Sequence, residues 1–237
     1  MRNILFAGGL LWLSASSWAG IALDATRIIF SSADDTSGQS VGIISSSDSS
    51  TPYLIRTQIL ATPYSDEGST PFLVTPSLFR LEPGATNQVR IMKKNVSLPQ
   101  DKESIFYLRA IAIPTSDKVQ AESKSNIGGN VQISTGSVIK LFYRPAHLAM
   151  PQQQAMKSLI FTRSEKGITV YNPSPYYITL NSLKIANKVI PISVKQGNTL
   201  IAPMSRNTYF RVPQQGSVEW KTLNDYGGVE VFHGKIQ

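Results

Sequence analysis

The chain has 237 residues, with 23 Lys and Arg against 15 Asp and Glu, and it contains no cysteine. The lack of cysteine excludes disulfides and thiolate metal sites, so apolar cores alone must stabilise the fold. The formal net charge of +8 comes from basic residues scattered along the sequence. This pattern favours a cationic surface that meets an acidic or carboxylate-bearing protein over one that binds nucleic acid or lipid.

Residues 1–19 are predicted to form a secretory signal peptide. They combine Arg2, an apolar run from Ile4 to Leu13, and the small-x-small cleavage signal Ser17-Trp-Ala19. A membrane-anchoring helix is the alternative, but the apolar run is shorter than the roughly 20 residues that a bilayer span needs. We therefore expect cleavage after Ala19 and an exported protein without membrane insertion and without a nucleic-acid partner.

Short runs rich in Val, Ile, Thr, Tyr and Phe follow, separated by clusters of Gly, Pro, Asn and Ser, which is an all-β pattern. The predicted strands of the first part are residues 21–30, 39–46, 53–61, 72–80, 86–93, 105–113 and 131–144. Between two of them, Leu81-Glu-Pro-Gly84 places Pro and Gly where a type II turn needs them. This number of strands predicts one immunoglobulin-like sandwich over residues 20–145.

The strand rhythm breaks after Pro145, at a Gln-rich and Pro-containing stretch, residues 146–154, which is the predicted linker. The pattern then resumes, with strands predicted at residues 158–162, 168–171, 176–183, 188–194, 208–212, 217–222 and 229–232. We expect residues 146–237 to hold this linker and a second, smaller sandwich. The long polar segment 115–129 is predicted to be a mobile loop.

No enzyme is visible in the sequence. The only histidines, His147 and His233, have no Ser or Asp partner at a motif spacing and are interpreted as surface residues. A phosphate-binding loop and a metal-ligand pattern are also missing from the sequence. We expect no catalytic residues, no metal, no cofactor and no ATP site, and therefore a binding protein.

Several segments taken together resemble the periplasmic chaperones of the chaperone/usher pathway, which assemble pili and fimbriae. They are Leu23-Asp-Ala-Thr-Arg-Ile-Ile-Phe30, Arg80-Leu-Glu-Pro-Gly84, Leu98-Pro-Gln-Asp-Lys-Glu-Ser-Ile-Phe-Tyr107, Ile139-Lys-Leu-Phe-Tyr-Arg-Pro145, Asn172-Pro-Ser-Pro-Tyr-Tyr177 and Asn224-Asp-Tyr-Gly-Gly228. The resemblance implies two immunoglobulin-like domains in a boomerang arrangement, in the periplasm. It also implies that the protein lends its G strand to pilus subunits that lack their last strand, and then delivers them to an outer-membrane usher without ATP.

The resemblance further implies an anchor for the C-terminal carboxylate of the subunit, made by Arg27 and Lys140. Lys140 stands out because it interrupts the apolar strand Ser137-Val-Ile-Lys-Leu-Phe-Tyr-Arg-Pro145. As an anchor it would set the register of strand pairing through charge-assisted bonds. The alternative is that Lys140 only protects a strand edge against aggregation.

The donor strand that the resemblance implies presents Val131, Ile133 and Thr135 to the subunit, at alternate positions. Without the resemblance, an ordinary half-buried strand would be the preferred interpretation. Thr135 departs from the bulky aliphatic residue that is common in the family. The depth to which the side chain at this position enters the groove of the subunit therefore stays open. Gly136 suits a bulge between the donor segment and Lys140.

An interdomain charge network of Glu103, Arg144 and Asp225 is also implied, with the arginine between two carboxylates. Taken singly, each residue would most often be a solvated surface charge. Arg109 stands where the family usually has a small polar residue, and the sequence offers no reason for it. The loop after residue 114 is long but lacks the cysteine pair of the long-loop branch, so the subfamily stays open.

Two other classes of function compete with this interpretation. An exported sandwich of this kind is also expected for a structural pilus subunit or a carbohydrate-binding adhesin module. A donated-strand pilin would instead begin with a free extension and contain one incomplete domain. A hydrolase comes third, and its sign would be a Ser, a His and an Asp that converge in a cleft.

Overall fold

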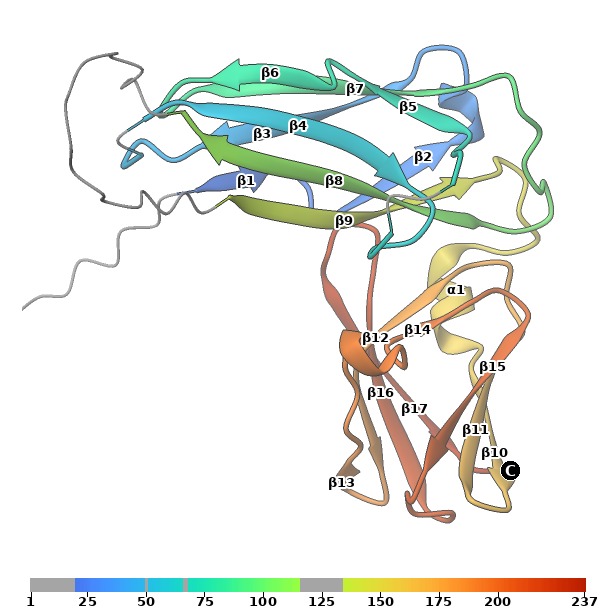
Figure 1. Cartoon of the computed structure of the whole chain (residues 1–237). Coiled ribbons are helices and arrows are strands. Elements are labelled where there is room, and N and C mark those ends of the chain that lie inside the picture. The colour runs from blue at the N-terminus through green and yellow to red at the C-terminus, as the bar shows by residue number, and fades with distance from the viewer. Residues whose placement is uncertain (1–19, 50, 66–67, 116–133) are drawn as a thin grey trace, which may run out of the picture.

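The computed structural model describes residues 20–49, 51–65, 68–115 and 134–237. Within these ranges the chain forms two β-sandwiches that meet at a bend, which confirms the predicted all-β, two-domain fold (Figure 1). The predicted signal peptide and most of the predicted mobile loop lie outside the described residues. None of the helices described is long and apolar enough to cross a membrane.

The first domain packs a four-stranded sheet against a five-stranded sheet. The four-stranded sheet has the order β1 (Ile21–Leu23), β3 (Gln39–Ser45), β7 (Thr86–Lys93) and β5 (Phe72–Thr75). The five-stranded sheet has the order β2 (Arg27–Ser31), β9 (Thr135–Arg144), β8 (Ser104–Pro114), β4 (Tyr53–Leu60) and β6 (Leu78–Leu81). Strands β2 and β9 run parallel, and the other neighbours run antiparallel.

Two of the predicted strands are each divided between the two sheets. The segment 21–30 leaves one sheet after β1 and joins the other as β2, and Asp24 holds the crossing because its Oδ2 accepts the N–H of Gly42 at 2.8 Å. The segment 72–80 is divided into β5 and β6 by Pro76, which has no N–H with which to continue a ladder. Both divisions depend on partners distant in sequence, so the local pattern shows one continuous strand.

The turn predicted from Leu81-Glu-Pro-Gly84 is present and spans residues 82–85. Gly84 has a φ of 71°, and the N–H of Ala85 donates to the carbonyl of Glu82 at 3.1 Å. Positive φ at the third position is what a type II turn requires, and glycine adopts it without a steric penalty. A short 3-10 helix, η1 (Ser32–Asp34), follows β2.

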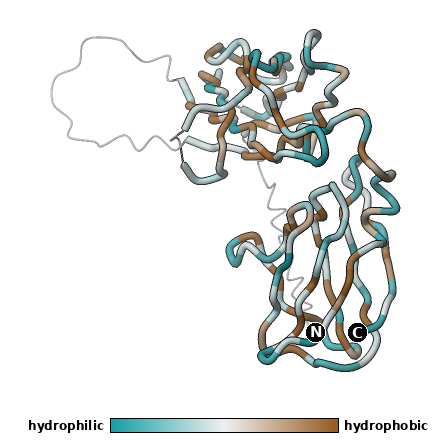
Figure 2. The backbone as a smooth tube through the Cα atoms, turned by 90° about the vertical axis from the view of Figure 1, so that its right-hand side faces the viewer, coloured by the Kyte–Doolittle hydropathy of each residue, from teal (hydrophilic) through white to brown (hydrophobic). Residues whose placement is uncertain are grey.

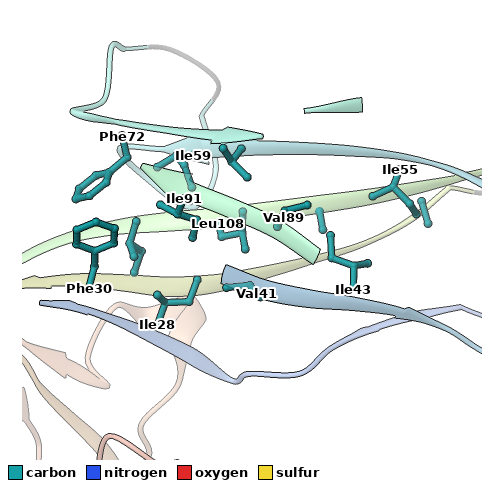
Figure 3. Packing of buried hydrophobic residues seen from close by; sticks show 14 of the residues in the cluster. Ile28, Phe30, Val41, Ile43, Ile55, Ile59, Phe72, Val89, Ile91 and Leu108 are labelled. Carbon is teal, nitrogen blue, oxygen red and sulfur yellow. The ribbon is translucent and has the colours of Figure 1, made fainter. Parts of the chain in front are cut away.

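Alternate residues of the strands build the core of the first domain, as the alternating colours along the tube indicate (Figure 2). Ile28 and Phe30 of β2 point inward against residues of the opposite sheet (Figure 3). The rings of Phe30 and Phe72 meet edge to face with centroids 5.0 Å apart. Because this core is filled by one face of each sheet, the other face of β9 is available for the second domain.

The second domain packs a three-stranded sheet against a five-stranded sheet. The first sheet has the order β10 (Ile160–Ser164), β11 (Gly167–Asn172) and β15 (Ser205–Phe210). The second has the order β13 (Lys188–Val189), β12 (Ile178–Ile185), β16 (Ser217–Leu223) and β17 (Val229–Lys235), and β14 (Leu200–Ile201) also pairs with β12. The helix α1 (Gln152–Lys157) precedes these strands, and the 3-10 helix η2 (Val194–Gln196) lies between β13 and β14.

Helix α1 begins inside the stretch where the sequence indicates only a linker. Its residues Ala155 and Met156 are buried in the second core, and the indole N–H of Trp220 donates to the carbonyl of Met156 at 3.0 Å. A helix of this length is too short to show a clear apolar period. Its formation therefore depends on tertiary burial.

In the motif Asn172-Pro-Ser-Pro-Tyr-Tyr177, the side chain of Asn172 is the centre of a buried hydrogen-bond network. The Nδ2 of Asn172 donates to the carbonyls of Tyr176, Ile201 and Ala202 at 2.7, 3.2 and 3.0 Å. Its Oδ1 accepts the Oγ of Ser174 at 2.6 Å. Because buried backbone carbonyls need donors, this one side chain joins the end of β11 to the segment after β14.

Replacing Asn172 with leucine should therefore destabilise the second domain by about 3 kcal/mol or more, since each buried group left without a partner costs roughly 1 to 3 kcal/mol. Urea denaturation of the purified protein measures this change. Asn207→Leu is the matched control, because Asn207 is only half-buried and its Nδ2 donates to a single backbone carbonyl, that of Leu200. Equal stability losses in the two variants would contradict the role assigned to Asn172.

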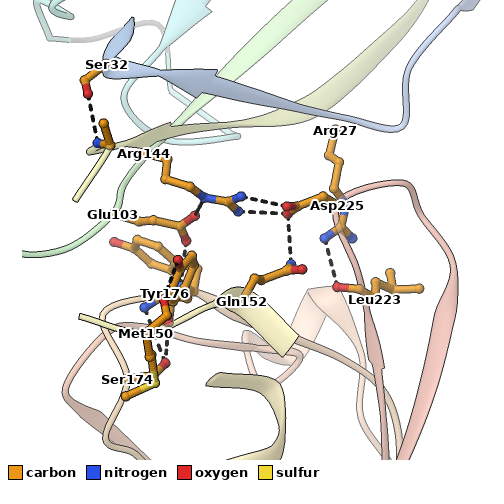
Figure 4. A network of polar contacts seen from close by, with 12 residues as sticks. Arg27, Ser32, Glu103, Arg144, Met150, Gln152, Ser174, Tyr176, Leu223 and Asp225 are labelled. Carbon is orange, nitrogen blue, oxygen red and sulfur yellow. Dashed lines mark hydrogen bonds and ion pairs between the residues drawn. The ribbon is translucent and has the colours of Figure 1, made fainter. Parts of the chain in front are cut away.

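The two domains are joined by a charge network centred on Arg144 at the end of β9 (Figure 4). Its Nε donates to Oε1 of Glu103 at 2.7 Å. Its Nη1 and Nη2 donate to the two carboxylate oxygens of Asp225 at 2.6 and 2.8 Å. Glu103 lies in the first domain and Asp225 in the second, so one guanidinium bonds a carboxylate of each domain.

Further contacts bury this network between the two domains, in the region that we call the hinge. Glu103 is 2% exposed in its side chain, and its Oε2 accepts the N–H of Tyr177 at 2.8 Å. The guanidinium of Arg144 also lies over the ring of Tyr176, 5.0 Å from the centroid. Gln152 of α1 donates to Asp225 at 2.8 Å, so the first helix of the second domain is tied to the same centre.

Burial works against both charges of the Arg144 and Glu103 pair. It raises the pKa of the Glu103 carboxyl, and the positive charge of Arg144 acts against that rise. For Arg144 burial is likewise the largest effect, but the bonds to Asp225 and the charge of Glu103 outweigh it and raise the pKa of the guanidinium. The network thus strengthens the positive charge of Arg144, whereas burial disfavours the charged form of Glu103.

Arg144→Ala should release the angle between the domains while each sandwich stays folded. Removing one partner of a buried ion pair costs about 3 to 5 kcal/mol, because the other charge stays buried without compensation. Small-angle X-ray scattering should show a broader distribution of molecular shapes. Lys184→Ala is the control, since its ion pair with Glu219 lies within one domain; scattering curves that coincide for both variants would contradict the hinge role.

Candidate functional site

One face of β9 is turned toward the second domain, and it carries charge at both ends. Lys140, Phe142 and Arg144 are at alternate positions and therefore share this face. Phe142 is buried against Tyr177 of the second domain, with ring centroids 5.8 Å apart. Arg144 belongs to the hinge network, whereas Lys140 lies toward the open end of the cleft between the domains.

Arg27 and Lys140 lie side by side on this face. They are register partners in the parallel pairing of β2 with β9, so their side chains leave the sheet in the same direction. Tyr107 of β8 is the partner of Lys140 on the other side. The sheet therefore presents a row of Arg27, Lys140 and Tyr107 across three neighbouring strands, which we call the cleft row.

The two cations of the cleft row differ from Arg144 because neither forms a salt bridge with a carboxylate among the described residues. Arg27 donates from Nη1 to the carbonyl of Leu223 at 3.2 Å, and its buried Nε–H has no hydrogen-bond partner among the described residues. Within the same described part of the chain, Lys140 forms no salt bridge. The cleft row therefore offers positive charge and free donors to an anion from outside the protein.

Desolvation is the main electrostatic effect on these cations. Burial lowers the pKa of Arg27, although the charges of Asp225 and Glu103 oppose this shift. Burial also lowers the pKa of Lys140, and repulsion by Arg27 adds to it. A bound carboxylate would remove much of this penalty, since an opposite charge nearby stabilises the charged form.

The first half of β9 is a free sheet edge that ends at the cleft row. Strand β2 pairs only with residues from Lys140 onward, whereas β8 pairs with β9 from Thr135. Among the described residues, β9 from Thr135 to Ile139 thus has a strand partner on one side only. A hollow of about 490 Å³ borders this edge, and Ile21, Ala22 and Ile44 contribute its apolar lining.

The predicted donor strand falls partly on this edge. Val131 and Ile133 lie outside the described residues, while Thr135 is the first residue of β9 and is exposed. The bulge considered at Gly136 is absent, because the pairing of β9 with β8 keeps one register through it. A Cβ at Gly136 would lie 3.2 Å from the carbonyl oxygen of Ala110, so a close approach of the backbone favours glycine here.

Sequence reasoning missed two parts of the site. Tyr107 was not singled out, and only its register opposite Lys140 brings it into the cleft row. The carbonyl of Leu223 carries no side-chain signal at all. Arg109, which had no explanation, donates from Nη2 to Gln58 at 2.9 Å on the neighbouring strand. Glu103, Arg144 and Asp225, which the resemblance implied as a network, lie together in the contacts described above.

Comparisons with known proteins agree with this geometry. Residues 20–149 match the model of the pili and flagellar-assembly chaperone PapD N-terminal domain, and residues 154–232 match that of the pili assembly chaperone PapD C-terminal domain. The chain is 34% identical to the chaperone protein FimC of Escherichia coli K12 over 231 residues, which is 95% of this chain and 89% of FimC. It is 37% identical to the probable fimbrial chaperone protein ElfD of the same strain, over 90% of this chain and 87% of ElfD.

Solved structures give the same result. The crystal structure of the E. coli chaperone DraB is similar with a TM-score of 0.76 and 30% identity, and the match covers 92% of this chain and 97% of DraB. The fold is also similar to that of the SafB chaperone complex with the Salmonella enterica SafA pilin, with a TM-score of 0.74, 24% identity and coverage of 93% and 98%. The chain belongs to the PapD-like family of pilus assembly chaperones.

Proposed function

We propose that this protein is a periplasmic chaperone that captures pilus or fimbrial subunits by donor-strand complementation and passes them to an outer-membrane usher. The observation that carries the proposal is an edge of β9 that is free in the described part of the chain and ends at two cations that form no salt bridge there. It is a binding function, and the cleft row requires neither a cofactor nor ATP. SafB, a relative in fold, was solved in complex with a pilin, which supports a pilus subunit as the partner.

Capture would proceed by strand addition at this edge. A subunit strand placed beside β9 from Thr135 to Ile139 would pair with backbone groups that have no neighbour on that side. Such a strand would be collinear with β2, because both would pair with the same side of β9. It would therefore end where β2 begins, at Arg27 and Lys140.

The C-terminal carboxylate of the subunit is the anion that suits this position. It is a charge that every chain carries on its last residue, so in a subunit whose final strand ends the chain it would mark the register of the pairing. Two cations on neighbouring strands can bond it at the same time, and charge-assisted bonds are stronger than neutral ones. A strand slipped by one residue would lose these bonds and turn its apolar side chains to the wrong face.

Upstream of Thr135, the chain would supply apolar side chains to the subunit itself. Val131, Ile133 and Thr135 alternate with polar residues, as expected for a strand with one apolar face. They would fill the groove that the missing strand leaves in the subunit and would cover an edge prone to aggregation. Transfer to the usher would then exchange one donated strand for another, without ATP.

Lys140→Ala and Arg27→Ala should each abolish stable capture while the fold is retained. Each removes a charge-assisted bond worth about 1.5 to 3 kcal/mol, and every 1.4 kcal/mol is tenfold in affinity. Co-purification with a pilus subunit that lacks its last strand, produced in the same periplasm, measures capture. Lys188→Ala, at an exposed lysine of β13, is the control; subunit yields that equal those of the wild type in both anchor variants would refute the anchor.

Ile133→Asp should abolish capture without changing the melting temperature of the free chaperone, because this side chain would face the subunit. If Ile133 were instead part of the protein's own core, a buried carboxylate without a partner would cost several kcal/mol and unfold the domain. Gln132→Asp places the same charge on the opposite face and is the matched control. Thermal denaturation separates the two cases, and a marked drop for Ile133→Asp alone would overturn the donor-strand assignment.

A further inference from the structure

In the second domain, one edge strand of each sheet borders the same groove. Strand β15 is the last strand of the three-stranded sheet, and β13 is the last strand of the five-stranded sheet. A groove of about 700 Å³, which we call the edge groove, is lined by residues of both strands. Gln196 and Asn198, from the segment between β13 and β14, close one part of its wall. None of the residues of the cleft row lines it.

The free side of β15 offers backbone hydrogen-bonding groups along this groove. Within the described part of the chain, β15 pairs with β11 only. The N–H of Arg211 donates to the carbonyl of Lys166 at 3.1 Å, so the backbone of Arg211 is directed toward the side of β11. Because this direction alternates along an antiparallel strand, the backbone groups of Thr208 and Phe210 point to the free side. This edge therefore presents the pattern that a further strand would pair with.

The edge groove also has an apolar lining, part of which is open to solvent. Ile190 and Tyr209 contribute buried side chains to it, and the hydroxyl of Tyr209 donates to the carbonyl of Asn198 at 2.7 Å. Val189 and Phe210 line the same groove from opposite strands, and they are 67% and 62% exposed. Exposed apolar side chains beside unpaired backbone groups are typical of a surface that a partner strand covers.

The charge of the edge groove is positive. Lys188 and Arg211 line it and are exposed, and the described residues of its lining include no Asp or Glu. Neither cation forms a salt bridge within the described part of the chain. Cations on an edge strand disfavour pairing with a second copy of the same chain, because like charges would meet. The same cations favour a strand that carries Asp or Glu.

We propose that the edge groove binds an extended, acidic segment of a partner protein as an added strand beside β15. The backbone of this segment bonds the free groups of Thr208 and Phe210, as in strand addition at other sheet edges. Its apolar side chains pack against Val189 and Ile190, and its carboxylates bond the exposed cations, of which Arg211 lies at the end of the strand. The edge groove and the anchor share no residue, so this is a second binding surface that does not depend on capture at β9.

Two strand-forming peptides test this inference on the full-length mature protein. Both alternate Val with a charged residue, which is Glu in one peptide and Lys in the other. Their C-termini are amidated, so that they carry no terminal carboxylate for the cleft row. Fluorescence anisotropy gives their affinities for the wild type and for the variants Val189→Ser and Arg211→Glu. The matched controls are Val231→Ser and Arg163→Glu, because Val231 is a 48% exposed valine of the edge strand β17 and Arg163 is an exposed arginine of the edge strand β10.

The Glu peptide should bind the wild type about tenfold or more tightly than the Lys peptide, since like charges repel at an interface. Arg211→Glu should lower its affinity about tenfold and Val189→Ser about fivefold, whereas the two controls should leave it unchanged. Amide hydrogen exchange followed by NMR should show new protection at Thr208 and Phe210 in the complex. No binding, equal affinities of the two peptides, equal losses in the controls, or protection confined to β9 from Thr135 to Ile139 would overturn the inference.

Discussion

The bonds of Arg144 to Glu103 and Asp225 are the interaction on which the working shape of this protein depends. Two sandwiches joined by a short connection would otherwise rotate against each other, which is the ordinary expectation for domains with a small interface. The guanidinium bonds one carboxylate from each domain in a hinge from which solvent is largely excluded. The cleft row can keep a constant position relative to the second domain only because this hinge is held.

The charges of the cleft fall into two groups that the hinge keeps apart. Arg144 is neutralised within the protein, and its pKa is raised. Arg27 and Lys140 are partly buried and form no salt bridge within the described part of the chain, and burial lowers their pKa values. Buried charge that a protein leaves uncompensated is a cost to its own stability. Such a cost is typical of a binding site, where the ligand supplies the missing charge.

Much of the fold was predictable because strand alternation and turn chemistry are local. The residues of the Glu-Pro-Gly turn before Ala85 specify a type II turn whatever the rest of the chain does. Lys140 could be singled out because a cation within an apolar strand conflicts with its surroundings. The divisions at Asp24 and at Pro76 could not be predicted, since each depends on which sheet the flanking residues join. Helix α1 was missed for a similar reason, because burial of Met156 is its main support.

The sequence by itself determined the all-β class, the two domains, and the candidates Arg27, Lys140, Glu103, Arg144 and Asp225, with the family motifs needed to assign their roles. These features depend on the order of residue types along the chain, which the sequence contains completely. Only the tertiary structure decided that Arg27, Lys140 and Tyr107 form one row and that β9 has a free edge ending there. Contacts of this kind depend on strand register and on the angle between the domains, which result from long-range packing and have no local signature in the sequence.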